Sequence, residues 1–315
     1  MASMKCLVTG IGGFIGSHLA ERLIRDGHSV RGVDNFLSGK EENLSSFESS
    51  IEFVNGDVRD RQLVNRLAEG IDWIFHLAAL VSVPRSMEEP GLAHDHNVGG
   101  TVNLFLAAKE QKVKKVVFAS SAAVYGDEYA LPCVETATPD PASPYALHKL
   151  TGEQYAALFH RIYDVQSVCL RFFNVFGPRQ DFESPYGAAI PKLLEKILKG
   201  QPPEIFGDGE QTRDFIHVDD IVSGLILAAQ APPEASGRVF NLGYGKRLSI
   251  NQLVEKMLEL LDSSLEPRFG PERPGDVRHS QADVSRARQV LGFRPAGDAL
   301  AGLARAIDWY RENLS

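Results

Sequence analysis

A serine, a tyrosine and a lysine are spaced in this chain as proton-transfer chemistry would require. Tyr145 and Lys149 lie four residues apart in "SPYALHK" (143–149), so on a helix they share one face. The pKa of a free phenol is about 10, so a tyrosine base near pH 7 needs a pKa lowered by about three units, or about 4 kcal/mol. A lysine ammonium one turn away favours the phenolate. Ser121 ends the apolar run "KVVFASS" (115–121), which predicts a serine at the end of a strand.

The elements expected to position these residues alternate along the first half of the chain. The strand patterns are continuously apolar, as in strands covered on both faces, and the helical patterns separate or follow them. Strands are predicted at 5–9, 29–34, 51–57, 72–79, 115–121 and 167–175, and helices at 14–27, 60–69, 92–110 and 144–163. This alternation predicts an α/β fold with a Rossmann-type, doubly wound parallel sheet, in which ligands bind at the carboxyl ends of the strands.

The pattern changes after residue 173, where proline and glycine become dense and the elements become shorter. We therefore expect a smaller second lobe that interleaves with the first. The predicted division gives a Rossmann domain over 1–173, with returning segments at about 213–240 and 299–313. The second lobe then comprises 174–212 and 241–298.

Composition and charge exclude several classes of protein. The 315 residues carry a formal net charge of −8, which argues against nucleic acid as a partner. No apolar run approaches the length of a membrane span, and the start of the chain lacks a secretory signal. Cys6, Cys133 and Cys169 are far apart and form no CxxC motif, so we expect reduced thiols, a cytoplasmic protein and no metal site.

A glycine-rich turn joins the first predicted strand to the first predicted helix. In "TGIGGFIG" (9–16), Gly10, Gly13 and Gly16 allow a tight turn and close approach of backbone to a pyrophosphate at the helix N-terminus. Asp34 ends the next strand, where a carboxylate binds ribose hydroxyls and repels a 2′-phosphate, which favours NAD over NADP. Asp57, after the third strand, is either a contact to the adenine amine or a helix cap.

These motifs together resemble the extended short-chain dehydrogenase/reductase family. The resemblance extends over nearly the whole chain and is strongest for the UDP-hexose 4-epimerases, especially those acting on N-acetylated sugars, in which a stretch like "SVPRS" (82–86) recurs. Further matching segments are "HLAA" (76–79), "NVGGT" (97–101), "RFFN" (171–174), "RDFIHVDD" (213–220) and "RPGDVRHS" (273–280).

The resemblance implies roles for the matching residues. Tyr145 would be the general base and acid, Lys149 its electrostatic partner and a ribose ligand, and Ser121 a hydrogen-bond donor to O4 of the sugar. The NAD site would be formed, with Tyr145 and Lys149, by Gly10, Gly13, Phe14, Ile15, Gly16, Asp34, Asn35, Asp57, Val58, Leu77, Ala78 and Ala79.

A UDP-sugar also needs groups for its two phosphates and its uracil. Arg213 and Arg273 are candidates to bind the diphosphate, because the planar guanidinium matches phosphate oxygens. The resemblance adds Asn174 near the diphosphate and Asp276 at the uridine ribose. It also places Ala189 in "AAIP" (188–191) and Phe206 in "EIFG" (204–207) at the uracil. The roles of Arg179 and Arg278 stay open.

Two positions bear on which sugar would fit. Ser280 resembles the position at which a bulky aromatic residue excludes an N-acetyl group in galactose-specific epimerases, and a serine leaves room for that group. Val81, on the opposite wall, is also modest in size. The expected substrates are therefore UDP-GlcNAc and UDP-GalNAc, with UDP-Glc and UDP-Gal as further candidates.

Alternative activities share parts of the same site. A sugar-nucleotide 4,6-dehydratase needs an acid and a base after the strand-end hydroxyl, where this chain has Ala122 and Ala123. A UDP-glucuronate 4-epimerase or decarboxylase needs a cation for the sugar carboxylate, which Arg85 could supply. A non-catalytic NAD-binding regulator would need none of the three catalytic candidates. The resemblance also implies a homodimer, in which the helices at 92–110 and 144–163 form a four-helix bundle with those of the partner.

Overall fold

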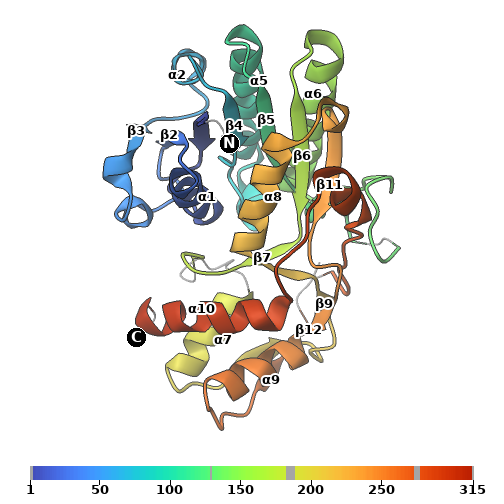
Figure 1. The fold of residues 1–315 in the computed structure, drawn as a ribbon. Helices are drawn as coiled ribbons and strands as arrows, with labels where there is room; N and C mark the ends of the chain where they lie inside the picture. The colour runs from blue at the N-terminus through green and yellow to red at the C-terminus, as the bar shows by residue number, and fades with distance from the viewer. Residues whose placement is uncertain (1–2, 128–129, 182–188, 273–276, 314–315) are drawn as a thin grey trace.

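A seven-stranded parallel sheet forms the centre of the molecule (Figure 1). The computed structural model describes residues 3–127, 130–181, 189–272 and 277–313. The strand order is β11-β6-β5-β4-β1-β2-β3. The strands are β1 (Lys5–Thr9), β2 (Ser29–Asp34), β3 (Ile51–Asn55), β4 (Trp73–His76), β5 (Lys115–Ser121), β6 (Ser167–Phe172) and β11 (Arg238–Leu242). This order reverses direction beside β1, as in a doubly wound sheet, and confirms the predicted fold class.

Helices cover both faces of the sheet, which explains why its central strands β1, β4, β5 and β6 are almost completely buried. One face packs against α1 (Phe14–Arg25) and α8 (Val218–Gln230). The other packs against α2 (Arg61–Leu67), α5 (Gly100–Glu110) and α6 (Pro144–Tyr163). Within the described residues, no helix has the length and hydropathy that a membrane span requires.

Helix α6 starts at a well-defined cap and packs closely on the sheet. Ser143 accepts a hydrogen bond from the Ala146 amide at 3.2 Å, and Pro144 occupies the first turn. At Gly152, an added Cβ would lie 2.3 Å from the ring of Phe118, so glycine permits the helix to approach β5. The helix before it, predicted at 92–110, consists of α4 (Pro90–His94), a π-helical turn (Asp95–Gly99) and α5, and is preceded by α3 (Val83–Glu88).

The strand predicted at 167–175 is wrong as a single element. β6 ends at Phe172, and β7 (Asn174–Phe176) leaves the large sheet to pair with β10 (Phe215–His217). Between them, the Phe173 amide donates to the Leu242 carbonyl at the end of β11. The chain therefore turns out of the sheet inside a continuous apolar run.

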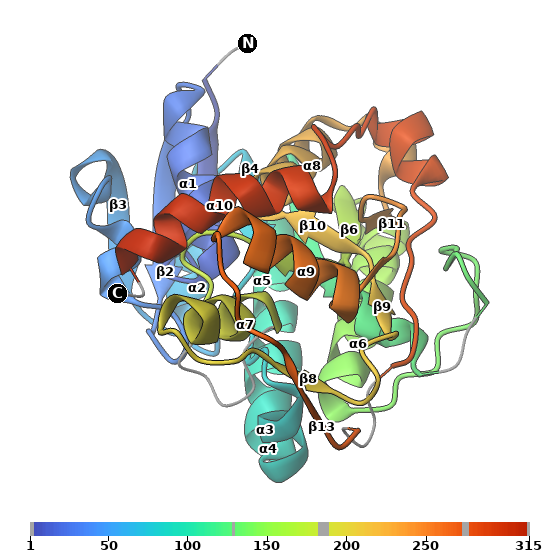
Figure 2. The same ribbon diagram turned by 90° about the horizontal axis from the view of Figure 1, so that it is seen from below.

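A second hydrophobic core is formed by helices that lie below the strands in Figure 1 and face the viewer in Figure 2. It is formed by α7 (Ala189–Leu198), α9 (Ile250–Leu260) and α10 (Ala299–Asn313). Three short strand pairs flank it: β7 with β10, β8 (Glu204–Phe206) with β13 (Arg268–Gly270), and β9 (Thr212–Arg213) with β12 (Leu248–Ser249). The segment 299–313, expected to return to the large sheet, instead buries Leu303, Ile307 and Tyr310 in this second core.

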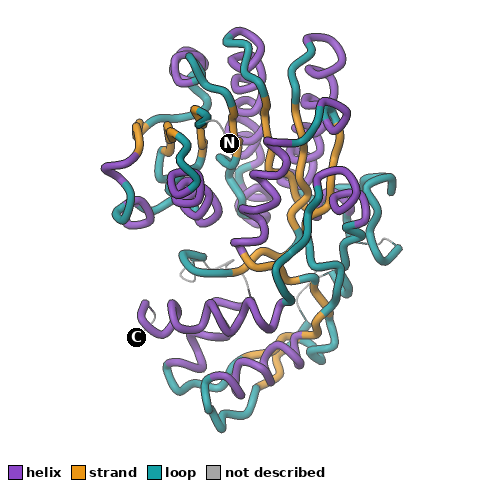
Figure 3. Tube along the Cα trace, in the orientation of Figure 1, coloured by secondary structure: helices purple, strands orange, loops and turns teal. Residues whose placement is uncertain are grey.

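A buried carboxylate ties the two parts of the chain together. Asp214, between β9 and β10, accepts the amides of Tyr244 (2.7 Å), Gly245 (2.9 Å) and Ala282 (3.0 Å). Its own carbonyl accepts the Asn174 amide at 3.1 Å. Burial raises the pKa of Asp214 to about 6, although the three amides act in the opposite direction. Figure 3 shows the strands of this region in orange and the loops that connect the sheet with the second core in teal.

Candidate active site

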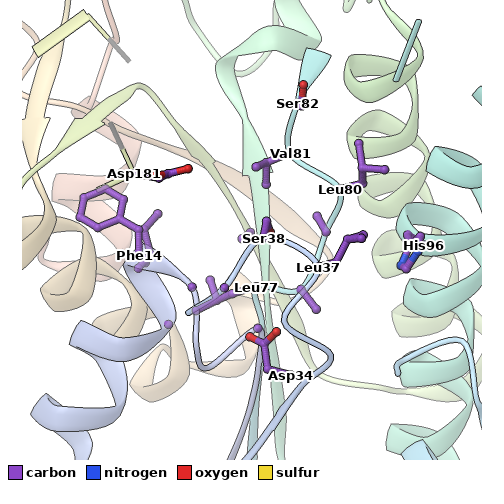
Figure 4. A pocket seen from close by; sticks show the side chains of 18 of the residues that line it. Phe14, Asp34, Leu37, Ser38, Leu77, Leu80, Val81, Ser82, His96 and Asp181 are labelled. Atoms are coloured by element: carbon purple, nitrogen blue, oxygen red, sulfur yellow. The ribbon is translucent and has the colours of Figure 1, made fainter. Parts of the chain in front are cut away.

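A cavity of about 810 Å³ opens at the carboxyl ends of the central strands. In Figure 4, Asp34 points into it from the sheet, Phe14 lies on one side, and Leu80 and His96 lie on the other. All but one of the predicted NAD-site residues line it: Gly10, Gly13, Phe14, Ile15, Gly16, Asp34, Asn35, Val58, Leu77, Ala78, Ala79, Tyr145 and Lys149. The exception is Asp57. Ser121 and Val81, predicted to meet the substrate, line the same cavity.

The glycine turn is held by close backbone contacts. Gly10 has a φ of +73°, and a Cβ there would lie 2.8 Å from the Ala78 amide nitrogen. A Cβ at Gly16 would overlap the Gly10 carbonyl oxygen. The apex at Gly12 is fixed from outside, because its amide donates to Asp34 (2.8 Å) and its carbonyl accepts from the Asn43 side chain (2.8 Å). The helix N-terminus at Phe14 is thus presented to the cavity with room for a phosphate.

The acidic residues at the ends of β2 and β3 differ in their surroundings. Asp34 accepts a second amide, from Phe36 at 2.8 Å, and burial raises its pKa. Burial also acts to raise the pKa of Asp57, but hydrogen bonds from Arg59 and Asn35, together with the charge of Arg59, lower the pKa to about 2. Asp57 also accepts from Asn35 at 2.9 Å. Asp34 lines the cavity, whereas Asp57 does not and is hydrogen-bonded to Asn35 and Arg59.

The three catalytic candidates meet at one end of the cavity. Ser121, at the end of β5, is hydrogen-bonded to the Tyr145 side chain, and the two come from separate elements, β5 and α6. Lys149 Nζ lies 5.8 Å from the centre of the Tyr145 ring and donates to the Ala119 carbonyl at 2.7 Å. The predicted spacing thus places the hydroxyl, the phenol and the ammonium side by side.

The pKa of Tyr145 is raised in the structure, whereas the sequence led us to expect that Lys149 would lower it. Burial raises the pKa of Tyr145, and the hydrogen bond with Ser121 acts to lower it. Burial also lowers the pKa of Lys149 to about 8, against the raising effect of Glu153. The lysine therefore does not by itself bring the tyrosine to the pKa of a neutral-pH base, because both groups are desolvated.

A smaller cavity of about 280 Å³ is lined by the short strands β7, β8, β9 and β10 and by the starts of α7 and α9. Four of the predicted UDP-sugar residues line it: Asn174, Ala189, Phe206 and Arg213. The Arg213 guanidinium donates to the Thr212 carbonyl at 2.9 Å. Arg273 and Asp276, predicted at the diphosphate and the ribose, lie outside the described residues.

Ser280 and three arginines have surroundings that the sequence did not indicate. Ser280 is buried, its amide donates to the Thr212 carbonyl, and it lines neither of these two cavities. Arg85 lines the larger cavity with Nε 2.7 Å from Glu89, and Arg179 lines it 2.9 Å from Glu21. Arg278 is paired with Asp208 at 2.7 Å.

Two polar clusters beside the site were missed. His76 bridges the hydroxyls of Thr9 (2.8 Å) and Thr101 (2.9 Å), which fixes the strand end before the glycine turn. In the other, the Ser120 hydroxyl donates to the Glu153 carboxylate. Glu153 lies four residues after Lys149, so the i, i+4 rule that joined Tyr145 and Lys149 would have found it.

Comparison with known proteins identifies the class. Residues 6–243 match the model of the NAD dependent epimerase/dehydratase family. The chain belongs to this family, and it is therefore an NAD-dependent enzyme. The glycine-lined helix terminus and the Asp34 carboxylate fit a dinucleotide, as that membership requires.

Three similar proteins are named as UDP-sugar 4-epimerases. A UDP-glucose 4-epimerase of Mycolicibacterium smegmatis is 42% identical, covering 98% of this chain and 99% of its own. The structure of a UDP-N-acetylglucosamine 4-epimerase from Methanobrevibacter ruminantium M1, in complex with UDP-N-acetylmuramic acid, has a TM-score of 0.94 at 41% identity, covering 99% and 100%. A UDP-glucuronic acid 4-epimerase variant from Bacillus cereus, in complex with a fluorinated UDP-sugar and NAD, has a TM-score of 0.91 at 31% identity, covering 98% and 100%.

Proposed function

We propose that this enzyme interconverts the C4 epimers of a UDP-hexose through a 4-keto intermediate. The observation that carries the proposal is the meeting of Ser121, Tyr145 and Lys149 in the cavity that the glycine turn also lines. Bound NAD supplies the acceptor for the hydride from C4 and returns it. The proposal concerns what this chain's own residues do around that exchange.

Tyr145 takes the proton of the 4-hydroxyl while the C4–H bond breaks, and it returns the proton when the opposite face is reduced. The Ser121 hydroxyl has a single proton, which it can donate to the phenolate or, with substrate bound, to O4 of the sugar. Lys149 favours the phenolate by its charge and is close enough to the cavity to hold a ribose hydroxyl. No net oxidation occurs, because the hydride and the proton both return.

The same geometry disfavours the alternatives. Elimination of water needs an acid and a base beside the strand-end hydroxyl, and Ala122 and Ala123 supply neither. Recognition of a glucuronate carboxylate needs an available cation, but Arg85 is paired with Glu89, and Glu88 also lines this cavity. The acidic neighbours would repel a second carboxylate.

N-acetylated substrates remain the preferred class. Val81 lines the cavity and is 56% exposed, so no bulky side chain stands at that wall. The gate role of Ser280 rests on the sequence resemblance alone. UDP-GlcNAc and UDP-GalNAc are accordingly proposed as substrates, with UDP-Glc and UDP-Gal as secondary ones.

The remaining assignments belong to the same proposal. The larger cavity would hold NAD and the sugar, and Asn174, Ala189, Phe206 and Arg213 would hold the uridine diphosphate. Residues 1–173 and the segment 213–240 would form the NAD domain of a cytoplasmic enzyme. A homodimer would form through the outer faces of the helices at 92–110 and 144–163. Leu147, Ile162 and Tyr163, all large apolar side chains, are exposed on α6 and would be covered by the partner.

Product analysis on a panel of UDP-sugars tests the proposal. Incubation with UDP-GlcNAc should yield UDP-GalNAc, and incubation with UDP-Glc should yield UDP-Gal. A 4-keto-6-deoxy sugar, a pentose, or turnover of UDP-glucuronate alone would contradict the assignment. Ser280→Tyr should suppress only the N-acetylated reaction, and equal loss of both reactions would remove Ser280 as the gate.

A further inference from the structure

A charged cluster lies buried behind the three catalytic candidates. Glu153 on α6 accepts hydrogen bonds from Ser120 Oγ at 2.5 Å, from Arg171 Nε at 2.9 Å and from Arg171 Nη2 at 2.7 Å. The side chains of Glu153 and Arg171 are 4% and 3% exposed. The guanidinium also stacks on Tyr125, 4.6 Å from the ring centre. A buried ion pair contributes little to stability over apolar residues of similar size, so another reason for it should be sought.

The position of Glu153 connects it to all three catalytic candidates. Tyr145, Lys149 and Glu153 follow each other at four-residue intervals and so share one face of α6. Ser120, which donates to Glu153, is the neighbour of Ser121 in β5. Lys149 donates to the carbonyl of Ala119, the residue just before Ser120. The Glu153 carboxylate thus connects α6, which carries Tyr145, with the end of β5, which carries Ser121.

The groups around Lys149 show why a carboxylate matters there. On α6 these are Tyr145 and Glu153, and β5 offers the Ala119 carbonyl and the Phe118 ring, 5.2 Å away. Two other strands supply the remaining titratable groups. His76 on β4 interacts with Lys149. Cys169 and Arg171 on β6 lie beside Glu153. Burial lowers the pKa of His76 to about 3 and raises that of Cys169, so both are neutral at pH 7. The negative charge acting on Lys149 is that of Glu153.

We propose that Glu153 is a positioning residue of the active site, which keeps Lys149 protonated beside Tyr145 and, through Ser120, holds the strand end that carries Ser121. Arg171 fixes the carboxylate in place and compensates its burial. The proposal rests on the proposed function insofar as Lys149 acts with Tyr145 in catalysis. Loss of the carboxylate would let Lys149 lose its proton at a lower pH.

A titration of Lys149 tests the charge role without any substrate. The protein is labelled with [13Cε]lysine, the Lys149 signal is assigned with Lys149→Met, and its chemical shift is followed against pH. In Glu153→Gln the midpoint should fall by about one pH unit or more. The matched control is Ser120→Ala, which removes one hydrogen bond and keeps the carboxylate, so its midpoint should match the wild type. Glu153→Gln with Arg171→Met replaces both members of the pair and serves if the single variant does not fold.

The pH dependence of kcat is the second measurement that tests the role of Glu153. In Glu153→Gln the fall in kcat at alkaline pH should move toward neutral by the same amount as the titration. An unchanged Lys149 midpoint in a folded variant without the carboxylate would overturn the proposal, as would an equal shift in Ser120→Ala. If the wild type turns over no UDP-sugar, the proposed function fails, but the titration still decides the role of Glu153.

Discussion

Substitution of Gly152 by alanine tests whether the approach of α6 to β5 sets the geometry of the site. The added Cβ would lie 2.3, 2.7 and 3.1 Å from three ring atoms of Phe118. Carbon atoms in contact lie about 3.5–4.0 Å apart, so the ring or the helix must move by about 1 Å. Phe118 is 2% exposed and is packed between Lys149 and His76, so the ring has little space to move. The helix is the part expected to shift.

The magnitude follows from two opposing contributions. Overpacking a buried site costs about 1–3 kcal/mol, and alanine gains about 0.5–1 kcal/mol over glycine inside a helix. The free energy of unfolding should therefore fall by up to about 2.5 kcal/mol, which for a chain of this length lowers the melting temperature by up to about 4 °C. Because Tyr145 and Lys149 lie on the same helix, a displacement of about 1 Å should also reduce kcat by about 100-fold.

Thermal unfolding and steady-state kinetics of the same preparations test whether the approach of α6 to β5 positions the site. The matched control is Gly91→Ala in α4, where no atom lies within 4 Å of an added Cβ. The control should melt at or above the wild-type temperature and keep its kcat. If Gly152→Ala melts with the control and retains kcat within about threefold, the close approach does not position the site.

Three further predictions concern the chemistry, the cofactor and the assembly. Tyr145→Phe should lower kcat by about 10²–10⁴-fold in a UDP-sugar epimerisation assay, and a loss under about tenfold would rule out the base role. Asp34→Ala should weaken NAD binding and raise the affinity for NADP relative to NAD in calorimetric titrations, because the carboxylate repels a 2′-phosphate; an unchanged ratio would show that Asp34 does not make the choice. Light scattering at micromolar concentration should give about twice the 34.6 kDa chain mass, and the monomer mass would argue against the dimer.

The sheet could be predicted because its signals are local. The strands at 5–9, 29–34 and 115–121 agree with the structure to the residue, since each is an apolar run bounded by polar or turn residues. The run at 167–175 misled because it stays apolar while the chain leaves the sheet. The segment 299–313 was expected to return to the sheet, but an amphipathic pattern does not specify which core receives its apolar face.

The residues of the candidate site, too, could be predicted where they belong to local motifs, and not where they depend on distant partners or on burial. The glycine turn, Asp34 and the tyrosine–lysine pair are local motifs, and the structure brings them to one cavity. Arg171 was overlooked because a lone arginine in an apolar strand gains meaning only from its partner, Glu153, 18 residues earlier. The pKa of Tyr145 was judged from charge alone, and burial, which the sequence does not specify, raises it.

The carboxylate of Asp214 bears on which part of the complex moves during turnover. It is completely buried, and it holds backbone from the end of β11 and from the segment at Ala282, next to the passage from β6 into β7. Separating these segments would leave a buried acceptor without its three amides, at a cost of about 1–3 kcal/mol for each lost partner. We therefore expect the two cores to act as one fixed frame. If the proposed epimerisation presents both faces of C4 to the same cofactor ring, we expect the sugar, and not the protein, to rotate about its bonds to the diphosphate.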